Sequence, residues 1–144
     1  MAVPETSAPV KAFRYVRRMN VPGDLRYTSD HEWVRQEGTR LRVGITDYAQ
    51  EALGDIVFVQ LPETGTRYDS GQSLSEVEST KSVSDVSSPL AGTVVEVNDT
   101  VAESPDLLNS DPYGAGWICI IEPDDPEATA TLLDAEGYSS LVAG

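Results

Sequence analysis

The sequence predicts a mostly β protein whose strands pack as a sandwich of two layers. Eleven glycines and nine prolines are spread over 144 residues, which favours many turns and short strands over a helix bundle. Short segments alternate apolar and polar residues, and two pairs of segments resemble each other in the same order along the chain. With 40% hydrophobic residues, the chain can fill one modest core, so we expect a single domain.

The first eighteen residues differ from the rest of the chain in charge. They hold four basic residues and one acid, namely Lys11, Arg14, Arg17, Arg18 and Glu5. They lack the apolar segment of a secretory signal and have little serine for a transit peptide. We interpret residues 1–18 as a disordered or non-native extension, with a short transit peptide or a basic interaction arm as alternatives. Residues 19–144 are then the folded domain.

The charge of the domain limits its partners. The whole chain has a formal net charge of −14, and residues 19–144 hold six basic and 23 acidic residues. A surface this acidic repels nucleic acid and anionic membranes and suits partners with basic docking surfaces. No stretch reaches the roughly 18 apolar residues that span a bilayer. The single cysteine excludes an internal disulfide framework.

The N-terminal half of the domain is expected to form two strand regions and a short helix. Residues 26–34 are the first strand region, and residues 41–46 alternate as a second strand. A helix is predicted over residues 48–53. Its predicted cap is Asp47, with a glutamine three residues later, and Gly54 stands where a helix ends.

An internal repeat follows. Residues 54–59 resemble residues 92–97, and residues 69–74 resemble residues 103–108, with offsets of 38 and 34 residues. A single pair of similar β segments would be weak support, but two pairs in the same order favour a true repeat. Two similar β units predict a sandwich with approximate two-fold symmetry.

Lys81 lies between the two repeated units. Both of its flanks can form short strands, and the polar residues 79–82 are then the turn of a hairpin, with Lys81 at the tip. Lys81 is also the only lysine after residue 18. A tight turn would present its amine to an acylating enzyme, and acylation would remove the charge and lengthen the side chain. The alternative is an ordinary exposed lysine in a loop.

The C-terminal part is expected to contain a turn, a strand and a weak helix. Residues 111–114 indicate the turn and residues 117–121 form an apolar strand. Residues 124–126 are typical of a helix start, with proline at the first helical position. The helix that follows has a partial apolar face, and Gly137 is expected to interrupt it.

Residues that could carry catalysis are few. The only histidine is His31 and the only cysteine is Cys119, so neither a metal-ligand cluster nor a Cys–His pair at motif spacing can form from them. We interpret His31 as a structural or surface residue and Cys119 as a buried, inert thiol in an apolar strand. The many carboxylates are best explained as a solvated surface. The sequence therefore gives little support to an autonomous enzyme.

These segments together resemble the glycine cleavage H-protein family. The resemblance includes the sequence VESTKSVSD around Lys81 and runs from about residue 20 to the C-terminus, over residues 30–34, 43–50, 53–59, 61–62, 77–85, 88–92, 95–98 and 108–117. It implies a β-sandwich of the biotinyl/lipoyl hammerhead type with a short internal helix and a C-terminal helix. It also implies that lipoate is attached to Lys81 through an amide.

The resemblance further implies a function in glycine cleavage. The carrier would shuttle the aminomethyl group of glycine from P-protein to T-protein and reducing equivalents to dihydrolipoyl dehydrogenase. A lipoyl/octanoyl transferase or a lipoate ligase would attach the arm to a monomeric chain that needs no metal. By position, Glu32 and Asp85 match acids that hold the amino end of the arm, whereas Asp30 departs from a small hydroxyl residue in some relatives. The location would be the cytoplasm of a bacterium or the mitochondrial matrix of a eukaryote.

Other classes of carrier fit less well. A lipoyl domain of a 2-oxo acid dehydrogenase would lack the segments at residues 31–33 and 111–117. A biotin carrier typically has methionines beside its lysine, where this chain has Thr80 and Ser82. A related carrier that acts in lipoate transfer stays open because the same lysine turn would serve it. A folded scaffold with no modification is the remaining alternative.

Overall fold

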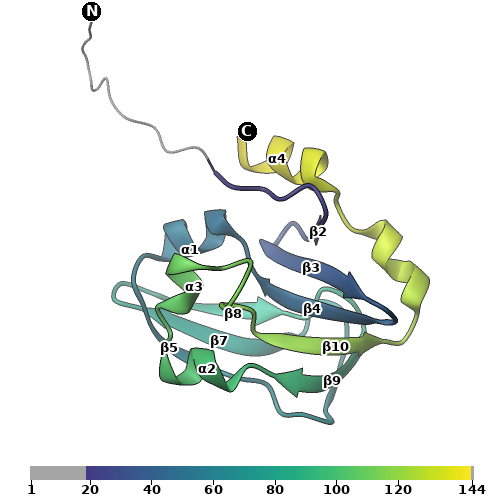
Figure 1. Ribbon diagram of the computed structural model, residues 1–144, viewed down its shortest axis with the longest axis horizontal. Coiled ribbons are helices and arrows are strands. Elements are labelled where there is room, and N and C mark those ends of the chain that lie inside the picture. The colour runs from purple at the N-terminus through teal and green to yellow at the C-terminus, as the bar shows by residue number, and fades with distance from the viewer. Residues whose placement is uncertain (1–18, 144) are drawn as a thin grey trace, which may run out of the picture.

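Two antiparallel sheets face each other across the main core (Figure 1). The computed structural model describes residues 19–143, so the prediction for residues 1–18 lies outside the described range. Within that range the larger sheet has six strands, in the spatial order β2 (Arg26–Tyr27), β3 (Glu32–Glu37), β4 (Arg40–Ile45), β10 (Cys119–Pro123), β9 (Gly92–Val97) and β6 (Arg67–Tyr68). The smaller sheet, counted over the same residues, has three strands, in the order β5 (Ile56–Gln60), β7 (Ser73–Ser79) and β8 (Val83–Ser87). The prediction of a mostly β sandwich is confirmed.

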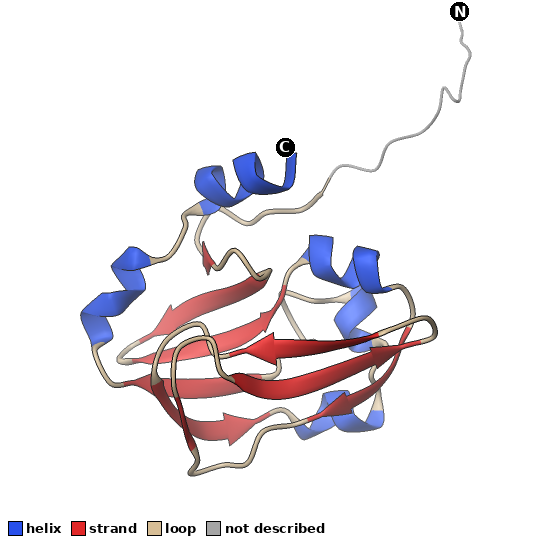
Figure 2. Cartoon of the chain, turned by 180° about the vertical axis from the view of Figure 1, so that it is seen from behind, coloured by secondary structure: helices blue, strands red, loops and turns tan. Residues whose placement is uncertain are grey.

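The core explains why the two sheets stay together. Val43 and Ile121 from the larger sheet and Val59 and Val77 from the smaller sheet belong to one buried cluster. Burial of such side chains stabilises the fold by about 1.5–3 kcal/mol each. Figure 2 shows the short helices grouped at the ends and edges of the sandwich rather than between its sheets.

A second, aromatic cluster lies at the edge of the larger sheet. Tyr27, Trp33, Tyr113 and Tyr138 are its large members. The rings of Tyr27 and Tyr138 stack with their centroids 4.7 Å apart, which joins the C-terminal helix to β2. The cluster is separate from the core between the sheets and includes Trp33, the residue after Glu32.

The first strand region is not continuous, contrary to the prediction for residues 26–34. The backbone N–H of Thr28 donates to the carbonyl of Glu32 at 3.0 Å, and that of His31 donates to the carbonyl of Thr28 at 3.2 Å. His31 takes a φ of +72° to complete this turn. The chain therefore reverses, and Tyr27 of β2 pairs with Trp33 of β3.

The internal helix α1 (Asp47–Leu53) is present, and Gly54 ends it with a φ of +87°, as predicted. The predicted cap is wrong, because the side chain of Thr46 accepts from the N–H of Ala49 and is the N-cap. Asp47 is instead the first residue of the helix. Its carboxylate accepts from the N–H of Asn20 at 2.9 Å and is nearly buried.

The repeat is kept in its first pair of segments only. Residues 56–59 lie in β5 and residues 92–97 form β9, although the two strands belong to different sheets. In the second pair, residues 69–74 turn into β7, whereas residues 103–108 span the end of α2 (Asp99–Glu103) and the start of α3 (Leu107–Ser110). The Asn98 side chain accepts from the N–H of Thr100 and caps α2, so the chain enters residues 103–108 from the end of a helix.

The C-terminal segment is a broken helix, as predicted, but the break lies elsewhere. The 3₁₀ helix η1 (Pro126–Thr131) begins at the capping side chain of Asp125, and α4 (Ala135–Ala143) follows it. Gly137 lies inside α4, because its N–H donates to the carboxylate of Asp134 at the start of that helix. The predicted apolar strand also begins two residues later than expected, at Cys119. Among residues 19–143, no helix is long and apolar enough to cross a membrane.

Candidate functional site

Lys81 lies at the tip of the β7–β8 hairpin, where the sequence predicts a turn. The backbone N–H of Ser79 donates to the carbonyl of Ser82 at 2.8 Å, which closes the turn. The Ser79 hydroxyl oxygen accepts from the N–H of Ser82 at 3.0 Å and from that of Lys81 at 3.3 Å. One serine side chain thus satisfies two backbone donors, and the Lys81 side chain is exposed at the tip.

A neighbouring loop supports the tip from the side. The carbonyl of Asp55 accepts from the N–H of Thr80 at 3.0 Å. The stem of Lys81 lies over Gly54, where a β-carbon would come within 3.2 Å of the lysine Cε. Glycine is therefore favoured at residue 54 by its positive φ, and the exposed lysine stem packs over its backbone.

Asn109 of α3 holds that loop in place. Its Nδ2 donates to the carbonyl of Gly54 and to the side-chain oxygen of Gln50, each at 2.9 Å. Its Oδ1 accepts from the N–H of Ile56 at 2.9 Å. One amide therefore links the end of α1 to the start of β5, on either side of Asp55, whose carbonyl supports the hairpin tip. Sequence reasoning missed Asn109, because its partners lie more than fifty residues away and no local pattern marks it.

Glu32 is a buried carboxylate that bridges the two sheets. It is only 2% exposed. Its Oε1 accepts from the Thr28 hydroxyl at 2.6 Å, and its Oε2 accepts from the N–H of Ser87 in β8 at 3.1 Å. Burial raises the pKa of Glu32 to about 7, although both hydrogen bonds oppose this shift. The carboxyl lines a pocket of about 330 Å³ between the β2–β3 turn and residues 70–71 and 88–89.

The pKa of Glu32 predicts a measurable pH dependence of stability. Between about pH 4.5 and 7 the folded state keeps a proton that the unfolded state has released, so stability falls as the pH rises through this range. The free energy of unfolding should drop by at most about 3 kcal/mol for this group. Urea unfolding at pH 5 and pH 8 measures the drop, and Glu32→Gln should reduce it. An equal drop in both proteins would contradict the assignment.

Asp85 occupies a different part of the surface. Its carboxylate is exposed and accepts from the Ser73 hydroxyl at 3.2 Å. It lines a separate pocket of about 360 Å³ together with Glu63, Tyr68 and Glu76. Asp30 lines the pocket of Glu32, not that of Asp85. The structure therefore does not bring Glu32 and Asp85 into one pocket, and their predicted role in holding an arm stays a prediction.

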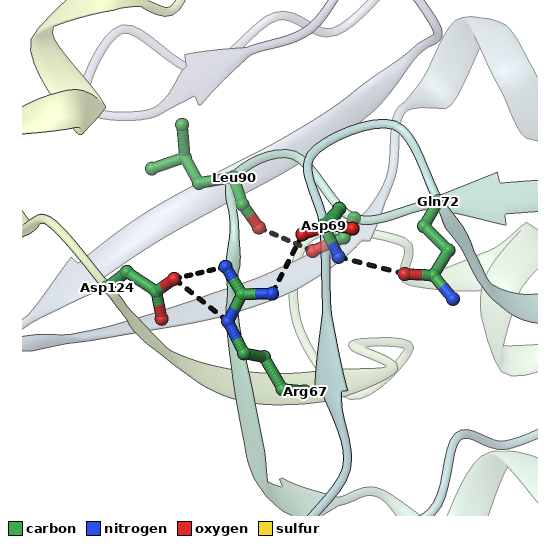
Figure 3. Close-up of polar contacts among 6 residues, drawn as sticks. Arg67, Asp69, Gln72, Leu90 and Asp124 are labelled. Carbon is green, nitrogen blue, oxygen red and sulfur yellow. Dashed lines mark hydrogen bonds and ion pairs between the residues drawn. The ribbon is translucent and has the colours of Figure 1, made fainter.

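An ion-pair cluster holds the loop between these two pockets (Figure 3). The Arg67 guanidinium donates to Asp69 at 2.7 Å and to Asp124 through two of its nitrogens. The N–H of Asp69 in turn donates to the side-chain oxygen of Gln72 at 2.9 Å. These groups are exposed and contribute little stability. The loop that they join includes Ser70 and Gly71, which line the Glu32 pocket.

His31 and Cys119 have structural surroundings, as the sequence indicates. The Nδ1 of His31 lies 2.8 Å from the Tyr138 hydroxyl, and its ring packs against Tyr48. Burial lowers the pKa of His31, against the opposing charge of Asp30. Cys119 is fully buried, and burial raises the pKa of its thiol to about 12. Within the described part of the chain, no three His, Cys, Asp or Glu residues are placed to hold a metal ion.

Known proteins of one family are similar to this chain over most of its length. The sequence profile of the family described as "Glycine cleavage H-protein" matches residues 25–143. The chain is 51% identical over 123 residues to the glycine cleavage system H protein of Myxococcus xanthus, covering 85% of this chain and 95% of the relative. It is 55% identical over 128 residues to that of Nocardia farcinica, covering 85% and 97%.

A solved structure also resembles this chain in its fold. The crystal structure of a glycine cleavage system H protein from Mycobacterium marinum superposes with a TM-score of 0.77 at 44% identity, covering 86% of this chain and all of that one. The sandwich is therefore of the lipoyl-domain type with short helices and a C-terminal helix. Since both the profile and the relatives span most of the sequence, the chain belongs to the glycine cleavage H-protein family.

Proposed function

We propose that this chain is the lipoyl carrier of the glycine cleavage system and that Lys81 bears the lipoyl group. The observation that carries the proposal is the position of Lys81, exposed at the tip of a hydrogen-bonded turn. Lys81 is also the only lysine among residues 19–143. Acylation would join the carboxyl carbon of lipoate to the lysine Nζ as an amide, so that the ammonium charge is lost and the side chain becomes a long arm.

The residues around Lys81 would present it rather than perform chemistry. The Ser79 hydroxyl and the Asp55 carbonyl hold the backbone of the tip, so an acylating enzyme meets a defined turn. Lipoate, once bound, would supply a disulfide that accepts the aminomethyl group and two electrons. P-protein, T-protein and dihydrolipoyl dehydrogenase would act on it in turn, with this chain as a monomeric, non-catalytic component. The compared relatives are bacterial, and we place the carrier in the cytoplasm.

Glu32 and Asp85 are the groups proposed to hold the amino end of a loaded arm. A protonated aminomethyl group favours carboxylate partners in a partly dry site. Glu32 offers the drier site, because its carboxyl is buried and lines a pocket. Asp85 lies on the same hairpin as Lys81, four residues further along the chain, and its carboxylate is exposed. An arm that contacts both carboxylates would have to extend over the surface from one pocket to the other.

Intact mass spectrometry tests the attachment directly. The chain, produced with lipoate and an active lipoate ligase, should gain the mass of one lipoyl group. An unchanged mass under conditions that lipoylate another carrier would overturn the proposal. Complementation of a bacterial strain that lacks its own glycine-cleavage carrier tests the pathway. Growth on glycine as the one-carbon source is expected, and failure of a fully lipoylated chain would favour a function in lipoate transfer.

A further inference from the structure

An apolar strip lies on the solvent face of the smaller sheet, beside the tip that carries Lys81. Among residues 19–143, the large hydrophobic side chains with high exposure are Val57, Phe58, Val83 and Leu141, at 55%, 47%, 59% and 45%. Three of these four belong to β5 and β8. Single exposed hydrophobic residues need no explanation, but a cluster of them on one face of one sheet does.

Strand register places these side chains together. Phe58 of β5 pairs with Glu78 of β7, and Glu78 pairs with Val83 of β8. Residues directly opposite each other in antiparallel strands point to the same face, so the three side chains form a row across the sheet. The next row, Val59 and Val77, points into the core and is buried. The row with Phe58 and Val83 therefore faces solvent.

A β-bulge enlarges the strip. The pairing of β5 with β7 shifts register between Ile56 and Phe58, and the two consecutive residues Val57 and Phe58 are both exposed. A regular strand would turn one of them inward. Bulges of this kind re-aim side chains and are frequent near functional sites. The strand thus exposes two apolar groups where alternation would expose one.

The charges around the strip indicate the chemical character of the surface that could bind to it. Glu78 lies within the row. Glu76 and Asp85 pair with each other one row beyond Val77, so they point to the same face as Glu78. The described residues of β5, β7 and β8 include no basic side chain, and Lys81 follows Glu78 by three residues. A partner surface must therefore be apolar at its centre and basic at its edge. A second copy of this acidic chain does not meet that requirement.

We propose that the strip formed by Val57, Phe58 and Val83 is the docking surface for the enzyme that acylates Lys81. This inference rests on the proposed function, because it assumes that Lys81 is acylated. Any enzyme that brings an acyl carbonyl to the Lys81 amine must cover the hairpin tip, and Val83 lies only two residues away. The strip is small, so the contact is weak and transient, as an enzyme that must release its product requires.

Lipoylation kinetics of the full chain test the proposal. The unmodified chain is the varied substrate of a lipoate–protein ligase supplied with lipoate and ATP, and intact mass gives the rate. The double variant Phe58→Thr/Val83→Thr should raise KM for the chain about tenfold with little change in kcat, since loss of an apolar contact weakens binding by about 1.4 kcal/mol. Higher ionic strength should also raise KM of the wild type.

Leu141→Gln is the matched control, because Leu141 is exposed to a similar extent but lies on α4, a helix that contacts β2 of the larger sheet. It should leave KM unchanged, and thermal unfolding should show that all variants stay folded. Val83→Thr alone, which is nearly isosteric, replaces the double variant if the latter unfolds. An unchanged KM in both strip variants, or an equal rise in Leu141→Gln, would overturn the proposal.

Two further outcomes would assign the strip to another occupant and would also overturn the proposal. Lipoylation could be normal while the KM of the carrier in glycine decarboxylation rises, which would indicate the decarboxylating enzyme. Lipoylation could be normal while the aminomethyl-loaded arm hydrolyses faster, which would indicate the arm itself. A wild-type chain that gains no lipoyl mass would refute the proposed function instead, so the two failures are distinguishable.

Discussion

Lys81→Arg is expected to yield a folded chain that gains no lipoyl mass and supports no glycine cleavage. Arginine keeps the positive charge, but its guanidinium is not deprotonated in proteins and is a poor nucleophile for acylation. The substituted side chain is exposed, and the hydrogen bond that residue 81 makes to Ser79 comes from its backbone N–H. The loss of modification should therefore be complete while the thermal midpoint stays close to that of the wild type.

Lys11 provides the control, because Lys11 and Lys81 are the only lysines of the chain. Lys11→Arg should be lipoylated at the wild-type rate. A lipoyl mass that persists in Lys81→Arg and disappears in Lys11→Arg would move the attachment to the N-terminal segment. That result would remove the hairpin tip from the proposed function.

Trp33→Ala should cause the largest loss of stability among the substitutions considered. Trp33 is fully buried, and its indole N–H donates to the carbonyl of Pro112 at 3.0 Å. Truncation would leave a cavity in the aromatic cluster and an acceptor without its donor. We expect a decrease of about 3–5 kcal/mol in the free energy of unfolding, measured by urea denaturation. Trp33→Phe should cost less, since it keeps most of the ring volume.

Gly44 allows a second test of the packing around Trp33. It pairs directly with Trp33, and a β-carbon at residue 44 would lie 2.7 Å from the indole ring. Gly44→Ala should therefore destabilise the chain by about 1–3 kcal/mol through overpacking. In the Trp33→Ala background the ring is gone, and the cost of Gly44→Ala should largely disappear. Strictly additive losses in the double variant would contradict direct contact between the two residues.

Local sequence patterns predict the hairpin tip well because its hydrogen bonds are local. The Ser79 hydroxyl bonds to backbone groups two and three residues away, and polar residues 79–82 mark such a turn in any sequence. The same holds for Gly54, whose positive φ ends α1. Thr46 and Asp47 are both good caps, so the pattern alone could not decide between them. In the structure the Asp47 carboxylate accepts from the N–H of Asn20, and Thr46 is the cap.

Features that depend on packing between distant segments were not predictable. The sequence places Glu32 in a strand, but burial between the two sheets raises its pKa, and its carboxylate accepts from the N–H of Ser87, 55 residues later. Asn109 likewise acts through partners in α1 and β5. The Asn98 side chain caps α2, and α3 follows it, so residues 103–108 are not the extended segment that the repeat suggests. The contacts of Glu32 and Asn109 are tertiary and leave no trace in the periodicity, whereas the cap at Asn98 is a local signal that competes with the repeat.

The link from Asn109 through the Gly54–Ile56 loop to Thr80 makes the base of the hairpin tip a fixed pivot. Any group attached to Lys81 would swing about that one point, within a volume set by its own rotatable bonds. Every enzyme of the cycle would have to enter this same volume, so only one could be served at a time. Each enzyme would then have to leave the hairpin tip before the next could bind there.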